Sequence, residues 1–163
     1  MSPLVIDILR WLHVVGAAVL FGTGAGIAFF MLLAHRTGDP KLVAHVAGSV
    51  VVADMVFTAV AVVLQPITGA ALAHGLGWSL TTGWIALSLG LYVATGALWL
   101  PVVAMQLRMR DLARAAAASG APLPEAYRTF FRLWFASGVP AFCFVAAILW
   151  LMIARPAVPW IDG

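Results

Sequence analysis

The sequence has very few charged residues: Asp, Glu, Lys and Arg make up 9% of its 163 residues, while 64% are hydrophobic. Soluble domains average about 25% charged and roughly 45–50% apolar residues. A soluble domain of this length would have too little polar surface here to cover its core. The composition therefore excludes a soluble fold and indicates an integral membrane protein.

Several kinds of chemistry are also missing. The single cysteine, Cys143, excludes an intrachain disulfide. The sequence has no serine or cysteine elbow, no HExxH, no phosphate loop and no paired carboxylates. The glycine-rich residues 22–26 lie inside an apolar segment with no preceding strand, so they are not a dinucleotide-binding loop. The net charge of +3 does not indicate nucleic-acid binding, because the basic residues lie in short loops beside apolar segments.

Four apolar segments, at residues 11–34, 46–74, 82–107 and 133–154, are each long enough to cross a bilayer. Short connections rich in turn-forming residues place consecutive segments side by side. We therefore predict an all-α fold, a transmembrane antiparallel four-helix bundle that forms one domain over residues 1–163. The third helix should continue past its span and break at Ser119-Gly120.

The basic residues predict the direction of the bundle. Seven of the nine Lys and Arg lie between residues 36 and 41 or between residues 108 and 132, whereas residues 75–81 contain none. Basic loops stay in the cytoplasm, so both termini should lie outside (N-out, C-out). The tryptophans agree, because most then fall at the outer boundary, where aromatic residues are enriched: Trp11, Trp78, Trp84, Trp150 and Trp160.

Small residues in the first span predict a close contact. Gly22 and Gly26 form a GxxxG pair, a spacing that lets two helices approach each other. The contact is either within the bundle or with a second copy in a homodimer. The same stripe would also leave room for a flat cofactor, although tight packing is its commoner use.

His13 is the most informative residue, because residues 11–33 contain no charged side chain. An imidazole inside a span is expensive and usually has a partner, such as a metal, a haem iron or a proton relay. We favour an axial haem ligand over an interfacial histidine that is satisfied by water or a headgroup. Arg10 or Arg155 would then pair with the haem propionates.

His74 lies at the end of the second span, on the same side of the membrane as His13. It is the best candidate for the opposite axial ligand. Counted at about 1.5 Å per residue, His13 lies level with Thr68, and His74 lies about 9 Å further out. The alternative is a histidine that interacts with the dipole at the C-terminus of its helix.

Asp54 is the only acidic residue inside a predicted span. A carboxylate at that depth must either bind a proton or find a partner. Arg132 and Arg108, at the inner ends of neighbouring helices, are long enough to reach it. We favour a structural ion pair or hydrogen bond, and proton handling or a salt bridge to a cofactor carboxylate stays open as the alternative.

The opening segment, from the run Trp11-Leu12-His13-Val14-Val15-Gly16 to Ala34-His35-Arg36, resembles the first helix of the CopD-like membrane proteins. That group includes copper-resistance protein D and the HemJ-type protoporphyrinogen oxidases. The whole chain resembles more closely an uncharacterised family of four-helix bacterial integral membrane proteins. The closer resemblance rests on residues 63–69, 99–103, 106–112 and 131–136.

The HemJ resemblance implies a b-type haem with the first-helix histidine as a ligand, a role that only His13 matches. HemJ-type proteins also carry a Trp-Leu-His-x-Lys motif in their third helix. This chain has Trp84-Ile85-Ala86-Leu87-Ser88 there, so the resemblance does not extend to the HemJ enzyme activity.

Three functions follow from these features. We favour a b-type haem-binding redox or electron-transfer protein of the bacterial inner membrane, with a redox partner or a lipid-soluble substrate; whether it is an oxidoreductase stays open. The second is CopD-like handling of a metal or small solute, although the six methionines are dispersed. The third is a non-catalytic membrane subunit that dimerises through Gly22 and Gly26.

Overall fold

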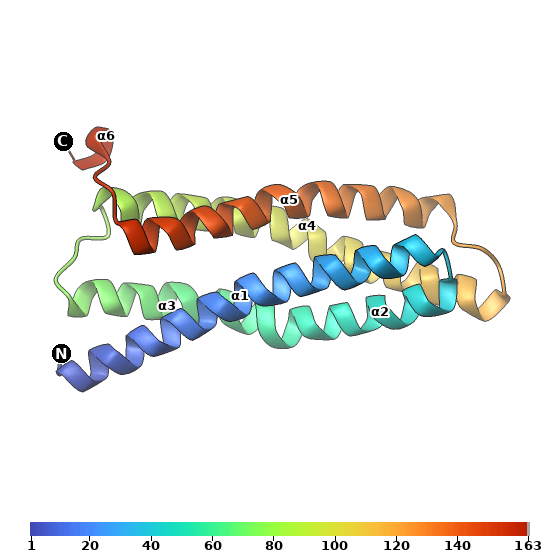
Figure 1. Ribbon diagram of the computed structural model, residues 1–163, viewed down its shortest axis with the longest axis horizontal. Helices are drawn as coiled ribbons and strands as arrows, with labels where there is room; N and C mark the ends of the chain where they lie inside the picture. The colour runs from blue at the N-terminus through green and yellow to red at the C-terminus, as the bar shows by residue number, and fades with distance from the viewer. Residues whose placement is uncertain (163) are drawn as a thin grey trace.

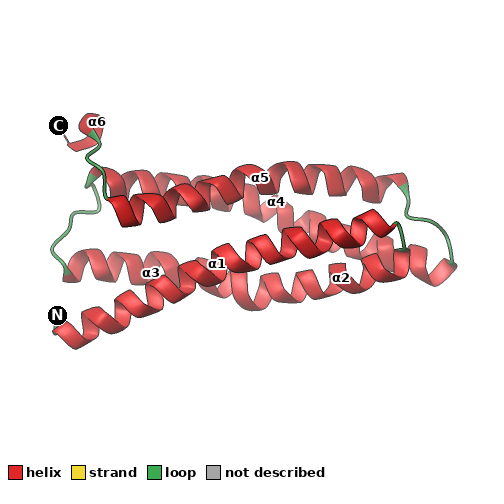
Figure 2. Ribbon diagram, in the orientation of Figure 1, coloured by secondary structure: helices red, strands yellow, loops and turns green. Residues whose placement is uncertain are grey.

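The computed structural model describes residues 1–162, and within them every regular element is a helix, joined by short loops, with no strand (Figure 2). Helix α1 spans Pro3–Thr37, and α2 (Pro40–Ala53), η1 (Asp54–Thr58) and α3 (Ala59–Gly75) together form one continuous rod. Helices α4 (Gly83–Ser119) and α5 (Glu125–Ala154) follow, and the short α6 covers Pro159–Asp162. Consecutive rods run in opposite directions (Figure 1).

Four rods are long and apolar enough to cross a membrane: Pro3–Thr37, Pro40–Gly75, Gly83–Ser119 and Glu125–Ala154. The predicted all-α transmembrane four-helix bundle is therefore confirmed. The end of α4 at Ser119 is also where the sequence predicts it. The direction of the bundle across the membrane and its extent as one domain over residues 1–163 stay predictions.

Local sequence explains where the helices end. Gly38 ends α1 and Gly120 ends α4, both in the left-handed conformation (φ 68° and 69°) that glycine adopts without strain. Pro40 begins α2, and the Asp39 carboxylate accepts a hydrogen bond of 2.9 Å from the Lys41 backbone N–H. The α1–α2 and α4–α5 connections that follow these helix ends both lie at one end of the bundle, here called the basic end (Figure 1).

Both termini and the α3–α4 connection lie at the opposite end, here called the terminal end (Figure 1). The four largest fully buried side chains belong to the core of the basic half: Met31, Val43, Met109 and Tyr127. The buried apolar cluster near the terminal end is much smaller, with Ala73, Trp84, Ile85 and Leu151. The helices are thus packed tightly in one half of the molecule and loosely in the other.

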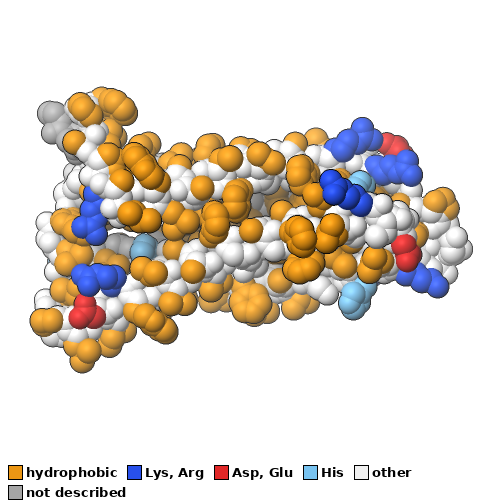
Figure 3. Space-filling model, viewed as in Figure 1, with side chains coloured by type: hydrophobic (Ala, Val, Ile, Leu, Met, Phe, Trp, Pro, Cys, Tyr) orange, Lys and Arg blue, Asp and Glu red, His pale blue; other side chains and the backbone are white. Residues whose placement is uncertain are grey.

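The outer surface suits a lipid environment. Large apolar side chains are exposed along the rods, for example Phe30, Val93, Leu100 and Ile153. Figure 3 shows Lys and Arg gathered toward the two ends, with an apolar band between them. Apolar area of this extent is not stable in water, and in a bilayer it contacts acyl chains.

Pro66 lies inside α3 and has no N–H to donate to the Val62 carbonyl four residues earlier. The hydroxyl of Tyr92 in α4 donates to that carbonyl instead. A neighbouring helix thereby satisfies the backbone group that the proline frees, which is how prolines are tolerated in membrane helices. The bond also ties α4 to α3.

We expect Tyr92→Phe to destabilise the bundle by about 1–3 kcal/mol, because the Val62 carbonyl is left without a donor. Reversible unfolding of the detergent-purified protein measures this cost. In a Pro66→Ala background the new N–H serves the carbonyl, so the same Tyr92→Phe change should cost clearly less. An equal cost in both backgrounds would show that the tyrosine does not replace the missing N–H.

The predicted N-out, C-out direction is testable by cysteine labelling in a Cys143→Ser background. A membrane-impermeant thiol reagent added from outside should label Gly77→Cys, in the α3–α4 connection, and leave Gly38→Cys, in the α1–α2 connection, unmodified. Permeabilised cells should label both variants. The reverse pattern in intact cells would contradict the positive-inside assignment.

Candidate functional site

A cavity of about 630 Å³ lies between the helices and is lined from α1, η1, α3, α4 and α5. Its lining is mostly apolar, but polar side chains gather at two levels. Arg10, His13 and Arg155 line it toward the terminal end. Asp54, Thr58, Trp99 and Gln106 line it deeper in the bundle. Asp54 precedes Thr68, the level of His13, by 14 residues in one rod, which separates the two levels by roughly 20 Å.

The ring of His13 is held by Thr68. His13 Nδ1 lies 2.8 Å from Thr68 Oγ1, and that hydroxyl donates to the Leu64 carbonyl at 2.8 Å. With its one proton directed to the Leu64 carbonyl, the Thr68 oxygen would accept from the Nδ1–H of His13. In this assignment His13 is the Nδ1-protonated tautomer, and the lone pair of Nε2 is left for a ligand. The predicted level of His13, beside Thr68, is confirmed.

Two glycines let α1 and α3 approach closely enough for this bond. A Cβ at Gly69 would lie 3.1 Å from His13 Cε1, and a Cβ at Gly16 would lie 2.2 Å from Gln65 Nε2. Gln65 Nε2 donates to the His13 carbonyl at 2.9 Å. The side chain and the backbone of His13 are therefore both tied to α3.

We expect Gly16→Ala to lower the melting temperature of the purified protein, because the buried Gln65 amide must leave the His13 carbonyl. Alanine favours helix over glycine by about 1 kcal/mol, so a loss would show that the clash dominates. Gly90→Ala is the matched control, since a Cβ there meets nothing within 4 Å. That variant should be as stable as the wild type or more so. A Gly16→Ala protein as stable as Gly90→Ala would contradict the close crossing.

The glycine stripe of α1 does not pack tightly. A Cβ at Gly22, Gly24 or Gly26 would meet nothing within 4 Å in the described part of the chain. The expectation of a close intramolecular contact at Gly22 and Gly26 is therefore wrong. Gly24 instead lines the cavity together with Ala17 and Ala25, so these small side chains leave open space there. A homodimer through Gly22 and Gly26 stays a prediction.

The two arginines near His13 lie at the terminal end of the cavity. Arg10 forms a 2.9 Å ion pair with Asp7, and both side chains are exposed. The Arg155 guanidinium lies 4.7 Å from the centre of the Trp78 ring, within cation–π distance. Both arginines line the cavity. An anionic group of a ligand beside His13 would have these two cations within reach.

His74 lies apart from this group. Its side chain is exposed at the end of α3 and is not part of the cavity lining. Its role as the opposite axial ligand stays a prediction. The described residues contain no group of three or more His, Cys, Asp or Glu side chains placed to hold a metal ion.

Asp54 is buried, with 3% of its surface exposed, and begins the π-helical turn η1. Trp99 Nε1 donates to Asp54 Oδ1 at 3.4 Å. With the Gln106 amide oriented so that both of its ends are satisfied, its nitrogen donates to Asp54 Oδ2 at 2.9 Å, and its oxygen accepts from Trp134 Nε1 at 3.3 Å. The carboxylate thus faces the bundle and is held by neutral donors.

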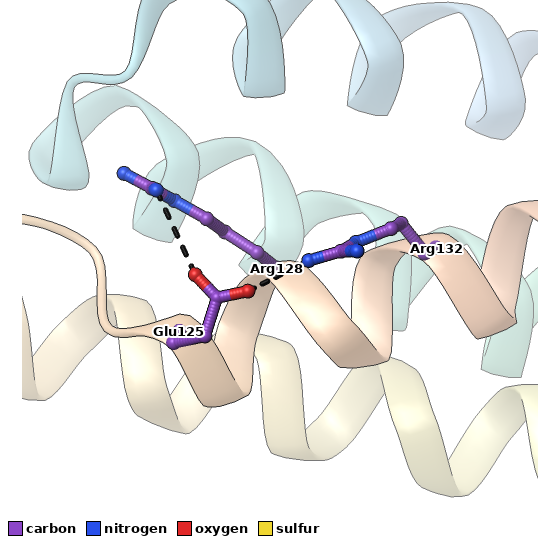
Figure 4. Close-up of polar contacts among 3 residues, drawn as sticks. All are labelled: Glu125, Arg128 and Arg132. Carbon is purple, nitrogen blue, oxygen red and sulfur yellow. Dashed lines mark hydrogen bonds and ion pairs between the residues drawn. The ribbon is translucent and has the colours of Figure 1, made fainter.

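Arg132 lies outside the Asp54 cluster. Its Nη2 is 2.6 Å from Glu125 Oε1, and Arg128 Nη1 is 3.7 Å from Glu125 Oε2 (Figure 4). All three side chains are exposed at the basic end. The structure therefore does not join Arg132 to Asp54, because a carboxylate on its own helix binds it in place of the one across the bundle. A proton-handling role for Asp54 or Arg132 stays a prediction.

From the sequence alone, Thr58, Thr68 and Gln106 are predicted only as polar residues that join neighbouring helices. The useful signal for Thr68 was its calculated level beside His13, whereas nothing in the spacing indicated that Gln106 would reach Asp54.

Residues 7–156 match the family model of the predicted integral membrane protein family DUF2269. No curated protein and no solved structure matches the chain. The match agrees with the closer of the two resemblances seen in the sequence, and it does not extend to the CopD-like group.

Proposed function

The chain belongs to the DUF2269 family of predicted integral membrane proteins, and from this premise we propose that it is a b-type haem-binding redox protein of the bacterial inner membrane. His13 is the proposed axial ligand. The observation that carries the proposal is the 2.8 Å contact between His13 Nδ1 and Thr68 Oγ1. Histidines that ligate metals usually donate their other ring N–H in this way, which orients the ring and raises its basicity.

The surroundings of His13 fit a porphyrin in three respects. The cavity volume of about 630 Å³ falls within the range of about 300–1,000 Å³ found for cofactor and ligand sites. The lining is mostly apolar, and Ala17, Gly24 and Ala25 leave space beside α1. Arg10 and Arg155 lie toward the terminal end, where they would pair with propionates.

In this function the residues of the chain have separate tasks. His13 would ligate the iron through Nε2, while Thr68 and Gly69 hold the imidazole in place. The apolar lining would exclude water and thereby help to set the reduction potential. A bound haem would supply one-electron chemistry. The first-helix resemblance to HemJ-type proteins supports the same role for His13.

The HemJ enzyme activity is not part of the proposal. The segment that aligns with the HemJ third-helix motif contains Ser88, whose hydroxyl donates to the Trp84 carbonyl at 2.7 Å. This bond is local to α4 and provides no ligand. His74 would become the opposite ligand only if the end of α3 moved toward the cavity.

We expect the wild-type protein from haem-replete cells to show a Soret band and, on reduction, resolved α and β bands. His13→Ala should abolish the haem spectrum or shift it strongly. Thr68→Val keeps the shape of the side chain but removes the acceptor for Nδ1–H, so haem affinity should fall about 10–100-fold. The absorption spectrum and haem content per protein measure both effects.

His45→Ala is the matched control, because His45 is exposed on α2 and does not line the cavity. Its spectrum should equal that of the wild type, and His74→Ala tests the opposite ligand separately. A colourless wild type, or full haem occupancy with an unchanged spectrum in His13→Ala, would refute the proposal.

A further inference from the structure

The deeper level of the cavity contains a polar site that the proposed haem does not use. Asp54, Thr58, Trp99 and Gln106 line the cavity roughly 20 Å along the rod from the level of His13. A ligand of His13 that extends toward Arg10 and Arg155 points away from this site. These four residues therefore require an explanation of their own.

The Asp54 carboxylate has unused capacity to accept hydrogen bonds. Trp99 donates to Oδ1 and Gln106 donates to Oδ2, one bond to each oxygen. A carboxylate accepts about four hydrogen bonds, so roughly half of its lone pairs remain. No Lys, Arg or His is bonded to this carboxylate in the described part of the chain. The site thus presents an acceptor to the cavity.

Thr58 presents a second polar atom that lacks a partner. Its residue is 8% exposed, and its Oγ1 is a buried side-chain atom without a hydrogen bond among the described residues. No hydrogen bond that meets the usual distance and angle limits joins this hydroxyl to the Asp54 carboxylate, which begins the same turn. A buried polar group left unpaired is costly, and in a native protein it calls for an explanation such as a water, an ion or a ligand that binds there.

The backbone explains why these two groups face the same space. In η1 the Ala59 N–H bonds the Asp54 carbonyl five residues earlier, as a π-helical turn requires. The turn presents Asp54 and Thr58 together toward the cavity, where Trp99 and Trp134 also line the wall. Such turns occur frequently at functional sites.

We propose that the Asp54–Thr58 site binds the ring hydroxyl of a lipid-soluble phenol or hydroquinone. The hydroxyl would donate to Asp54 and accept from Thr58 Oγ1, which satisfies both groups with one ligand atom. An ammonium group has only donors and would leave the Thr58 proton without an acceptor on the ligand. The aromatic ring suits the indoles of Trp99 and Trp134, and an alkyl tail suits the apolar remainder of the cavity. This site does not depend on haem binding at His13.

The test measures binding of 2-decylhydroquinone to the detergent-purified full chain by calorimetry under anaerobic conditions. Its dimethyl ether, which has the same ring and tail but no O–H, is the matched ligand. The wild type should bind the hydroquinone about tenfold more tightly than the ether, because one hydrogen bond to a buried partner contributes about that factor. Equal affinity for the two ligands would overturn the proposal.

Thr58→Val should reduce hydroquinone affinity about tenfold without lowering the melting temperature of the ligand-free protein, because it removes a hydroxyl that has no partner. Thr95→Val is the matched control. Thr95 also lines the cavity, but its hydroxyl already donates to the Leu91 carbonyl at 2.8 Å. A loss of affinity in Thr95→Val that equals the loss in Thr58→Val would contradict the site.

Asp54→Leu should abolish the preference for the hydroquinone over the ether, provided that the variant elutes as a folded protein; Thr58→Val carries the test otherwise. His13→Ala should bind hydroquinone as the wild type does, and Thr58→Val should keep the haem spectrum. Failure of the haem assignment is thereby distinguishable from failure of this site. Tighter binding of decylammonium than of the hydroquinone, lost in Asp54→Leu, would show a cation site and overturn the proposal.

Discussion

The close crossing of α1 and α3 is the constraint on which the terminal half of the molecule depends. At positions 16 and 69 a Cβ would collide with the Gln65 amide and crowd the His13 ring, and glycine removes both contacts. Gln65 and Thr68 then bond the backbone and the ring of His13 across the contact. These bonds hold α1 against α3, and the space between α1 and the helices α4 and α5 stays open as the cavity. The same contact thus fixes an imidazole and leaves a cavity beside it.

The polar groups of the bundle follow a common rule. In a bilayer no water competes for backbone and side-chain groups, so each must find a partner on a neighbouring helix. Tyr92 donates a hydrogen bond to the Val62 carbonyl, and Trp99 and Gln106 donate to the Asp54 carboxylate. Trp134 donates to the Gln106 oxygen. Against this background the unpaired hydroxyl of Thr58 is conspicuous.

The fold could be predicted from the sequence because length and hydropathy suffice to define a membrane span. Levels along the membrane were also predictable, since helix rise alone placed His13 beside Thr68. The rotation of each helix about its axis was not predictable, and rotation decides which side chains meet. Gly22 and Gly26 therefore face open space in place of a neighbouring helix. Asp54 faces the Trp99 indole and the Gln106 amide of α4, while Arg132 bonds Glu125 on its own helix.

The π-helical turn at Asp54–Thr58 has a consequence for the rod that contains it. The turn contains one residue more than an α-helical turn, so the sequence positions that face the bundle move by one place after it, about 100° on an α-helical wheel. This extra residue lets the half that packs into the tight core and the half that carries Gln65 and Thr68 both face the bundle, although no single α-helical period describes both. Deleting one residue from the turn would restore an α-helical turn and leave both halves with their native faces, whereas a deletion elsewhere in the rod would rotate one half away from the bundle.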